Sequence, residues 1–400
     1  MGFDPRKNRA VSAVLCALVV AATLAAAGRA GRSLAGLETE DLSPGEERAP
    51  AIELAYVRPL MPVESGRNDS NPVWSPSGAL IAFERSRGDK KEIVIARPDG
   101  SVVHTIYYQL SEGGTAPKFS FPGIVEDISY NAGIAWAPGS DRLVFMSNGG
   151  GGNYDLYLRA LDGKTTRLTA HKEKDGHAHW SPKADELAFV SGRTGEGDVY
   201  LLDVATRAVT RLTWGAKPHL YPQWSPDGRK IVMIHGRNEN HDVYLIEDVR
   251  RPLETLKALT TWTYDDLRPV WSPDGKKIAF YSNYNPAGDP KVWAILVIAA
   301  DGSDPTQGDG LAARVVATDV VADVERGPAW MPDSNGIVYV RNDREEYNPV
   351  YVADLVRKTN LALKTDTKMN HDIASSVSGV IVFRAQVDQW DQIFLTKMKE

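Results

Sequence analysis

Polar side chains recur at two fixed distances before a repeated tryptophan in this sequence. Five residues before each tryptophan, or before its equivalent in the last repeat, stand Asp69, Asn131, Asp175, His219, Asp266, Glu325 and Met369. Three residues before it stand Asn71, Gly133, His177, Tyr221, Arg268, Gly327 and His371. Carboxylates at the first distance could attract a cation or a basic peptide, and the mixed second set offers the varied donors and acceptors that recognise a ligand.

Histidine is concentrated at these positions. Four of the eight histidines in the chain are His177, His179, His219 and His371. Neutral imidazoles with a carboxylate such as Asp175 nearby are possible ligands for a transition metal. The sequence has no HxxxH or HExxH motif, so it leaves metal binding undecided and indicates no cofactor.

The tryptophans open copies of one short motif, which suggests how these side chains are positioned. WSPDGRKIVM (224–233) and WSPDGKKIAF (271–280) are accompanied by WSPSGALIAF (74–83), WAPGSDRLVF (136–145), WSPKADELAF (180–189), WMPDSNGIVYV (330–340) and ASSVSGVIVF (374–383). The intervals of 62, 44, 44, 47, 59 and 44 residues indicate a unit of about 44 residues with two insertions. A repeat of this length is typical of a propeller blade.

Each unit reads as four antiparallel strands. The tryptophan ends the first strand, Ser-Pro-Asp-Gly makes a turn, and an apolar segment such as KKIAFYS forms the second strand. Segments such as DVYLLDV (198–204) and AVTRLTW (208–214) supply the third and fourth. Four-stranded units in series predict an all-β protein of the β-propeller class, in which the six repeat tryptophans pack between blades.

The ends of the chain predict how the ring closes. The seventh unit stops after its third strand (391–398), and a strand-like segment, AIELAYVRPL (51–60), precedes the first unit. Pairing these two segments completes seven blades and removes an open sheet edge. A ring of six blades, the alternative, leaves one unit unplaced.

The motif resembles the WD40-like (PD40) repeat of the TolB family. The resemblance rests on Asp-x-x-Pro-x-Trp-Ser-Pro-Asp-Gly at 266–275, followed by Ala-Phe, a Gly-rich hairpin, Asp-Val-Tyr and Leu-Thr, and it covers residues 51–400. It implies a propeller that binds proteins or peptides in the cell envelope. We expect no counterpart of the additional domain that precedes the TolB propeller, because only a short linker separates the N-terminal segment from the first strand.

The N-terminal residues predict export. Residues 1–30 form a basic start followed by an Ala-rich apolar run that contains the single cysteine, Cys16. This pattern is typical of a signal peptide, with an uncleaved membrane anchor as the alternative. Residues 31–50 are polar and aperiodic and are expected to form a flexible linker. The formal net charge of −6 disfavours nucleic-acid binding.

The function predicted from the sequence is therefore that of an exported, monomeric, non-enzymatic propeller. The sequence lacks a GxSxG nucleophile motif and an alternating helix–strand segment for a hydrolase domain. We expect a protein or peptide partner, or else a glycan, in the periplasm or another extracytoplasmic space. The expected binding residues at the channel mouth are Asp69, Asn131, Asp175, His177, His219, Tyr221, Asp266, Arg268, Glu325 and His371. The alternative is a propeller lyase or hydrolase with a metal-dependent active site in the funnel.

Overall fold

The computed structural model describes most of the chain after residue 50. The described residues are 51–88, 90–107, 133–148, 153–195, 197–236, 240–284, 292–302, 313–323, 326–343 and 347–399. The predicted signal segment and linker, residues 1–50, lie outside them. Within the described part, the one named helix is the four-residue α2 (Pro252–Thr255), and no helix there has the length and hydropathy that a membrane span needs.

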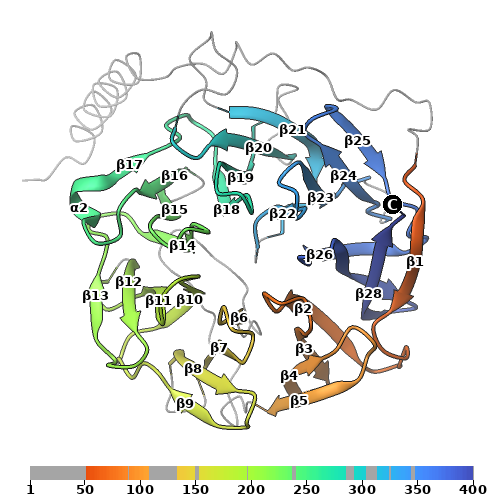
Figure 1. Cartoon of the computed structure of the whole chain (residues 1–400), viewed down its shortest axis with the longest axis horizontal. Coiled ribbons are helices and arrows are strands. Elements are labelled where there is room, and N and C mark those ends of the chain that lie inside the picture. The colour runs from red at the N-terminus through yellow and green to blue at the C-terminus, as the bar shows by residue number, and fades with distance from the viewer. Residues whose placement is uncertain are drawn as a thin grey trace, which may run out of the picture. The chain divides into compact units, whose positions relative to one another are not determined.

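The described residues form seven four-stranded antiparallel sheets that are arranged in a ring (Figure 1). Blade one contains β2 (Asn68–Trp74), β3 (Ile81–Arg87), β4 (Lys90–Ala96) and β5 (Val102–Tyr107). Blade two contains β6 (Ala135–Trp136), β7 (Arg142–Ser147), β8 (Asp155–Ala160) and β9 (Thr165–Arg167). Blade three contains β10 (Asp175–Trp180), β11 (Glu186–Ser191), β12 (Asp198–Asp203) and β13 (Val209–Arg211).

The remaining blades follow the same order from the innermost strand outward. Blade four contains β14 (His219–Trp224), β15 (Ile231–Gly236), β16 (His241–Ile246) and β17 (Leu256–Ala258). Blade five contains β18 (Asp266–Trp271), β19 (Lys277–Ser282), β20 (Trp293–Ala299) and β21 (Ala313–Val320). Blade six contains β22 (Ala329–Trp330), β23 (Gly336–Val340), β24 (Val350–Asp354) and β25 (Thr359–Ala362). Blade seven contains β26 (Lys368–Ser375), β27 (Val380–Val387), β28 (Trp390–Met398) and β1 (Leu54–Pro59).

The N-terminal strand closes the ring, as the sequence predicts. Strand β1 pairs antiparallel with β28, and Pro59 lies opposite Phe394 (Figure 1). The Thr396 hydroxyl donates to the Tyr56 carbonyl at 2.7 Å. This pairing gives the seventh blade its fourth strand, so the ring has seven blades and the six-bladed alternative is wrong.

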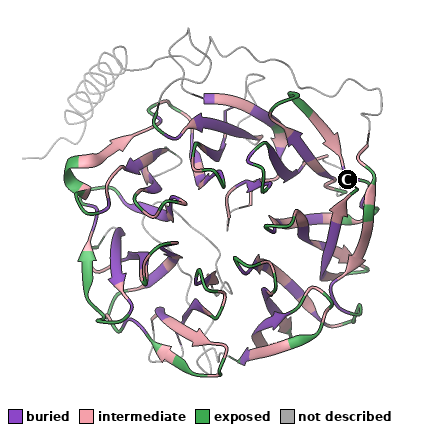
Figure 2. Ribbon diagram, in the orientation of Figure 1, coloured by how far each residue is buried: buried purple, intermediate pink, exposed green. Residues whose placement is uncertain are grey.

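The core lies between neighbouring blades. The second strand of each blade is mostly buried, whereas outermost strands such as β9 and β13 are largely exposed (Figure 2). Because both faces of a middle strand pack against other blades, its sequence is a continuous apolar run such as Ile81-Ala82-Phe83 and does not alternate.

The repeat tryptophans connect each blade to the one before it. All six are at most 9% exposed. Four of them donate their indole N–H to a carbonyl in the inner strand of the preceding blade, from Trp136 to Val73, Trp180 to Ala135, Trp271 to Gln223 and Trp330 to Val270. The prediction that these side chains pack between blades is confirmed. Outside this set, Trp214 is 40% exposed.

Candidate functional site

A distortion of the inner strands places one side chain from each of several blades toward the centre of the ring. In β2, β10, β14 and β18 the pairing with the next strand shifts register at the positions just before the tryptophan. The residue three positions before the tryptophan has a positive φ in each: 52° at Asn71, 49° at His177, 56° at Tyr221 and 54° at Arg268. A bulge of this kind breaks the alternation of the strand and redirects the side chain.

The redirected side chains line a central cavity of about 570 Å³. Asn71, Gly133, His177, Tyr221 and Arg268 all contribute to its wall, together with residues of the tryptophan and proline turns. A cavity of this volume is in the range of small-ligand and peptide-side-chain pockets. Six of the seven positions of this set, Gly327 included, thus line one cavity, and their role in ligand binding stays a prediction.

Three of these residues contact one another across three blades. The guanidinium carbon of Arg268 lies 3.3 Å from the centre of the Tyr221 ring, and the His177 ring meets the same ring edge-on at 4.4 Å between centres. Burial in the channel, and secondarily the Arg268 charge, hold the pKa of His177 well below 6.5. His177 is therefore neutral at pH 7, and the positive charge of this group belongs to Arg268.

A second arginine reaches the cavity from blade six. Arg326 precedes β22 and lines the cavity wall. Its Nη1 donates to the carbonyl of Pro72, in β2 of blade one, at 2.5 Å. Sequence reasoning missed this residue because it stands one position after Glu325 and outside both sets of repeat positions.

Blade seven follows a register one residue later than the sequence alignment assigned. Its turn is closed by the Gly379 N–H, which donates to the Ser376 carbonyl, just as Gly78 donates to Ser75 in blade one. Ser375 therefore occupies the tryptophan position, and Asp372, with a φ of 50°, occupies the bulge position assigned to His371. The missing tryptophan and proline are the reason why the alignment slipped.

Asp372 is held in place by its neighbours. Its carboxylate pairs with Arg384 Nε at 2.8 Å and accepts the Asn71 backbone N–H at 3.2 Å. His371 lies beside it, with Nε2 at 3.5 Å from the Asn348 side-chain nitrogen, and is not among the residues that line the cavity.

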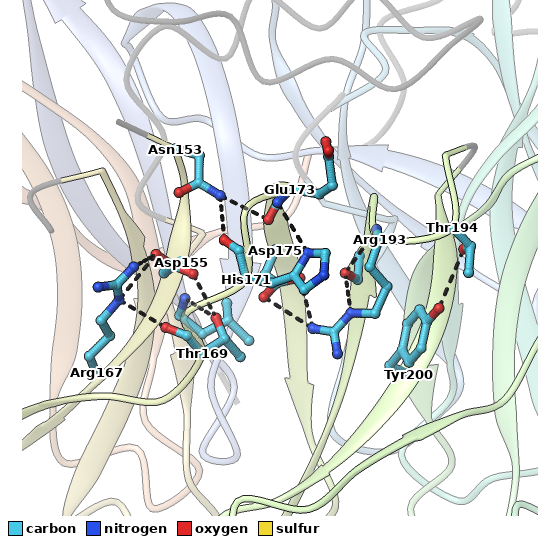
Figure 3. Close-up of polar contacts among 12 residues, drawn as sticks. Asn153, Asp155, Arg167, Thr169, His171, Glu173, Asp175, Arg193, Thr194 and Tyr200 are labelled. Atoms are coloured by element: carbon cyan, nitrogen blue, oxygen red, sulfur yellow. Dashed lines mark hydrogen bonds and ion pairs between the residues drawn. The ribbon is translucent and has the colours of Figure 1, made fainter. Parts of the chain in front are cut away.

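The carboxylates five positions before the tryptophan do not form an open acidic mouth. Asp69 is 2% exposed and is bound by Arg85 at 2.7 and 2.9 Å, and Asp175 is fully buried beside Arg193 at 3.3 Å (Figure 3). Asp266 is also fully buried, and burial raises its pKa well above 3.8. The prediction that these three carboxylates form an acidic channel mouth is therefore corrected, because they are paired or desolvated inside the blades.

His219 is buried in the same layer. It is 1% exposed, stacks on His235 at 4.2 Å between ring centres, and places Nδ1 at 3.6 Å from Asp198. The described polar residues of the first set thus lie in the interior of the blade junctions and do not line the cavity: they are Asp69, Asp175, His219 and Asp266.

A repeated buried network explains why these positions are polar. Asp155, at the start of β8, binds Arg167 and lies 3.3 Å from the Thr169 hydroxyl (Figure 3). Asp198 makes the equivalent contacts with Arg211 at 2.8 Å and Thr213 at 3.2 Å. The sequence signal of this network is an aspartate in the third strand together with Arg-Leu-Thr in the fourth strand. Asp155 lies near Asp175 of the next blade, and Asp198 lies near His219 of the next blade.

Two predicted site residues, Asn131 and Glu325, lie outside the described residues. Gly327 is described, and it shows why a glycine stands at that position: a Cβ there would lie 2.3 Å from the Arg268 carbonyl oxygen and 2.4 Å from Val270 Cγ1. Within the described ranges, no group of three or more His, Cys, Asp or Glu side chains is placed to hold a metal ion.

Comparisons with known proteins agree with this architecture. Residues 120–307, which include strands β6 to β20, match the family model described as the TolB beta propeller domain (PD40). The comparison with curated protein sequences finds no match.

The solved structures to which this chain is similar include TolB, an oligogalacturonate lyase and a peptidase. TolB from Acinetobacter baumannii has 19% identity and a TM-score of 0.47 over 75% of this chain, which spans 64% of that protein. An oligogalacturonate lyase in complex with manganese has 14% identity and a TM-score of 0.62, with 88% of this chain and 95% of the lyase covered. A puromycin-hydrolyzing peptidase from Mycobacterium tuberculosis has 13% identity and a TM-score of 0.59, with 88% and 56% covered.

Likeness at such low identity shows the fold and leaves the activity open. The seven closed blades show that the chain is a β-propeller, and residues 120–307 of it match the TolB beta propeller domain.

Proposed function

We propose that this protein is an exported binding module whose central cavity receives a segment of a protein or peptide partner. The observation that carries the proposal is the contact of His177, Tyr221 and Arg268 on the cavity wall. Three strained, bulged positions in successive blades bring an imidazole, a phenol ring and a guanidinium together. Backbone strain of this kind costs on the order of 1–3 kcal/mol at each residue and is concentrated at functional sites.

The type of cavity wall supports a peptide as the occupant. Aromatic side chains such as Trp136 and Trp180, the turn prolines and small apolar residues make up most of the wall, and a few polar groups stand among them. Apolar walls with a few oriented donors suit a segment with mixed side chains. The N-terminal pattern of residues 1–30 supports action outside the cytoplasm, in the periplasm or another extracytoplasmic space.

Affinity capture tests this proposal. Purified protein is immobilised and exposed to a detergent extract of the envelope, and the captured proteins are quantified by mass spectrometry. The matched variants are His177→Ala, inside the cavity, and Tyr347→Ala, whose ring is 50% exposed outside it. A partner captured by the wild type and by Tyr347→Ala, but reduced at least fivefold by His177→Ala, supports the proposal. Equal capture by all three proteins contradicts it.

A second candidate is an enzyme, favoured by the same contact. A neutral imidazole next to a phenol could transfer a proton, and a fixed guanidinium could stabilise a negative charge. One similar structure is an oligogalacturonate lyase with manganese. Metal analysis of the protein, with incubation of oligogalacturonate in the presence of manganese, distinguishes the candidates: cleavage that His177→Ala abolishes supports the enzyme, and an unchanged substrate opposes it.

A further inference from the structure

The buried carboxylates at the junction of blades two and three are balanced by arginines. Asp155, at the start of β8, pairs with Arg167 of β9. Asp175, at the start of β10, lies 3.3 Å from Nη2 of Arg193. An ionised carboxylate inside a protein is costly unless a cation or several hydrogen bonds compensate its charge. The two arginines provide that compensation here.

The junction of blades four and five has an aspartate at the first of these positions but lacks the arginine. Asp242, in β16, accepts a hydrogen bond from the Thr260 hydroxyl at 3.5 Å. In the strand pairing, Ala258 stands at the position that Arg167 takes in blade two. No described cation forms an ion pair with Asp242. Burial raises the pKa of Asp242 to about 6, although the Lys217 charge acts to lower it.

Asp266, the second aspartate of this junction, has also lost its arginine. It lies opposite Ser282 in the strand pairing, and the residue two positions after Ser282 is Tyr284, where blade three has Arg193. The Asp266 side chain is fully buried, and neither of its carboxylate oxygens meets the geometry of a hydrogen bond with a described residue. Burial raises the pKa of Asp266 well above 3.8, and the Asp242 charge acts in the same direction.

The other described side chains at this junction do not replace the arginines. The polar and titratable side chains that face the pair are Thr260, Trp262 and Ser282 near Asp266, and Lys217, His235, His241, Tyr244 and Asp265 near Asp242. The first three act to lower the pKa of Asp266, but burial has the larger effect. Burial lowers the pKa of His235 to about 4, so this ring carries no charge at pH 7. His241 is engaged by Asp265, with Nδ1 at 2.5 Å from the carboxylate oxygen.

We infer that Asp242 and Asp266 make the junction of blades four and five a proton-dependent joint, which is closed while they carry protons and weakens when they ionise at higher pH. A neutral carboxyl group can stay buried, whereas two ionised carboxylates without a cation repel each other and are stable only in contact with water. The joint lies close to the cavity wall, because Arg268 follows Asp266 by two residues on β18 and stacks on Tyr221 of blade four. The inference does not depend on the binding of a partner proposed above.

The direction of the pH effect follows from the two carboxyl groups. A carboxyl group that binds its proton more tightly in the folded than in the unfolded chain stabilises the fold at low pH. This contribution is complete below the ordinary pKa of 3.8 and is lost as the pH rises through the folded-state value, which is about 6 for Asp242. Comparison with a variant that lacks the carboxyl group removes the pH effects of all other groups.

Urea unfolding at a series of pH values from 4 to 7 tests the inference. The ratio of folded to unfolded protein for the wild type, divided by that for Asp242→Asn or Asp266→Asn, should fall about tenfold per pH unit between pH 4 and pH 6. Asp175→Asn is the matched control, since Asp175 has its arginine, and the same quotient should not fall. Ala258→Arg restores the arginine of blade two and should remove most of the fall seen against Asp242→Asn.

Hydrogen exchange locates the effect within the ring. After correction for the intrinsic exchange rate, amide exchange in β16 and β18 of the wild type should become faster from pH 5 to pH 8, and this change should be absent from Asp266→Asn. Equal acceleration in all seven blades, or quotients that stay constant for both Asn variants, would overturn the inference. It would also be overturned if Ca²⁺ or K⁺ stabilised the wild type and not Asp266→Asn, because a bound cation and not a proton would then balance the pair.

Discussion

The Arg268 guanidinium stacks on the Tyr221 ring at 3.3 Å, and each residue sits at the same bulged position of neighbouring blades. The pair joins blades four and five at the cavity wall, and the His177 ring of blade three packs edge-on against the Tyr221 ring. The repeat thus places equivalent positions of neighbouring blades on the same cavity wall, and the side chains at those positions determine the chemistry of the cavity.

The Tyr221 ring is expected to stabilise the fold as well as to orient Arg268. Tyr221 is 5% exposed, so Tyr221→Ala should lower the free energy of unfolding by about 3 kcal/mol, as large-to-small changes in a core do. Tyr221→Phe keeps the ring and should cost less than about 1 kcal/mol. Urea unfolding of both variants measures the difference. Equal costs would mean that the hydroxyl, and not the ring, supports this wall.

Ring closure depends on β1. Deleting residues 1–50 should leave the midpoint of urea unfolding nearly unchanged, whereas deleting residues 1–61 removes β1 and leaves the edge of β28 unpaired. The longer deletion should lower the midpoint or cause aggregation, because open edges pair with other chains. Light scattering and circular dichroism during the titration report both effects. Identical curves for the two truncations would contradict closure by β1.

Gly327 is expected to tolerate no side chain. Gly327→Ala places a methyl group within 2.4 Å of the Arg268 carbonyl oxygen and of Val270, and backbone cannot move aside cheaply, so we expect a loss of about 1–3 kcal/mol. Gly139→Ala is the matched control, since its Cβ meets only the flexible Asp141 side chain. Thermal unfolding of the two variants side by side measures the cost. A Gly327→Ala protein as stable as the control would contradict the close approach of these segments.

Protonation of His179 is expected to lower the free energy of unfolding in mild acid. Burial lowers the pKa of His179 to about 4, and its Nδ1 accepts the backbone N–H of Trp224 at 3.2 Å. A folded-state pKa below the ordinary value of 6.5 means that this contribution to stability is present above pH 6.5 and is lost as the pH falls through 4. His179→Asn removes the titration, so the advantage of the wild type over this variant should shrink from pH 7 to pH 4. An advantage that stays constant over that range would contradict a buried neutral His179.

The fold was predictable because each turn and strand of the repeat has its own local signal in the sequence. The WSPDG turn, the continuous apolar second strand and the spare strand at 51–60 determined blade number and closure, and the structure confirms them. The cavity positions were predictable as a set because identical spacing in a repeat leads to equivalent places.

The chemistry of the site was less predictable, because a polar residue on an inner strand can face either the channel or the blade junction. The partner that buries Asp175 is Arg193, eighteen residues later, and no spacing rule connects the two. Arg326 and Asp372 were missed because one lies outside the repeat register and the other in a blade that has lost its tryptophan.

Site-specific crosslinking tests occupation of the cavity most directly. A photo-crosslinking amino acid replaces His177, on the cavity wall, or Val356, which is 70% exposed on the outside of blade six. After irradiation in cells that produce the protein, crosslinked products are separated by mass and identified by mass spectrometry. We expect one discrete protein or peptide partner to be crosslinked from position 177 and not from 356. A partner crosslinked from 356 alone, or the same products from both positions, would contradict binding in the central cavity.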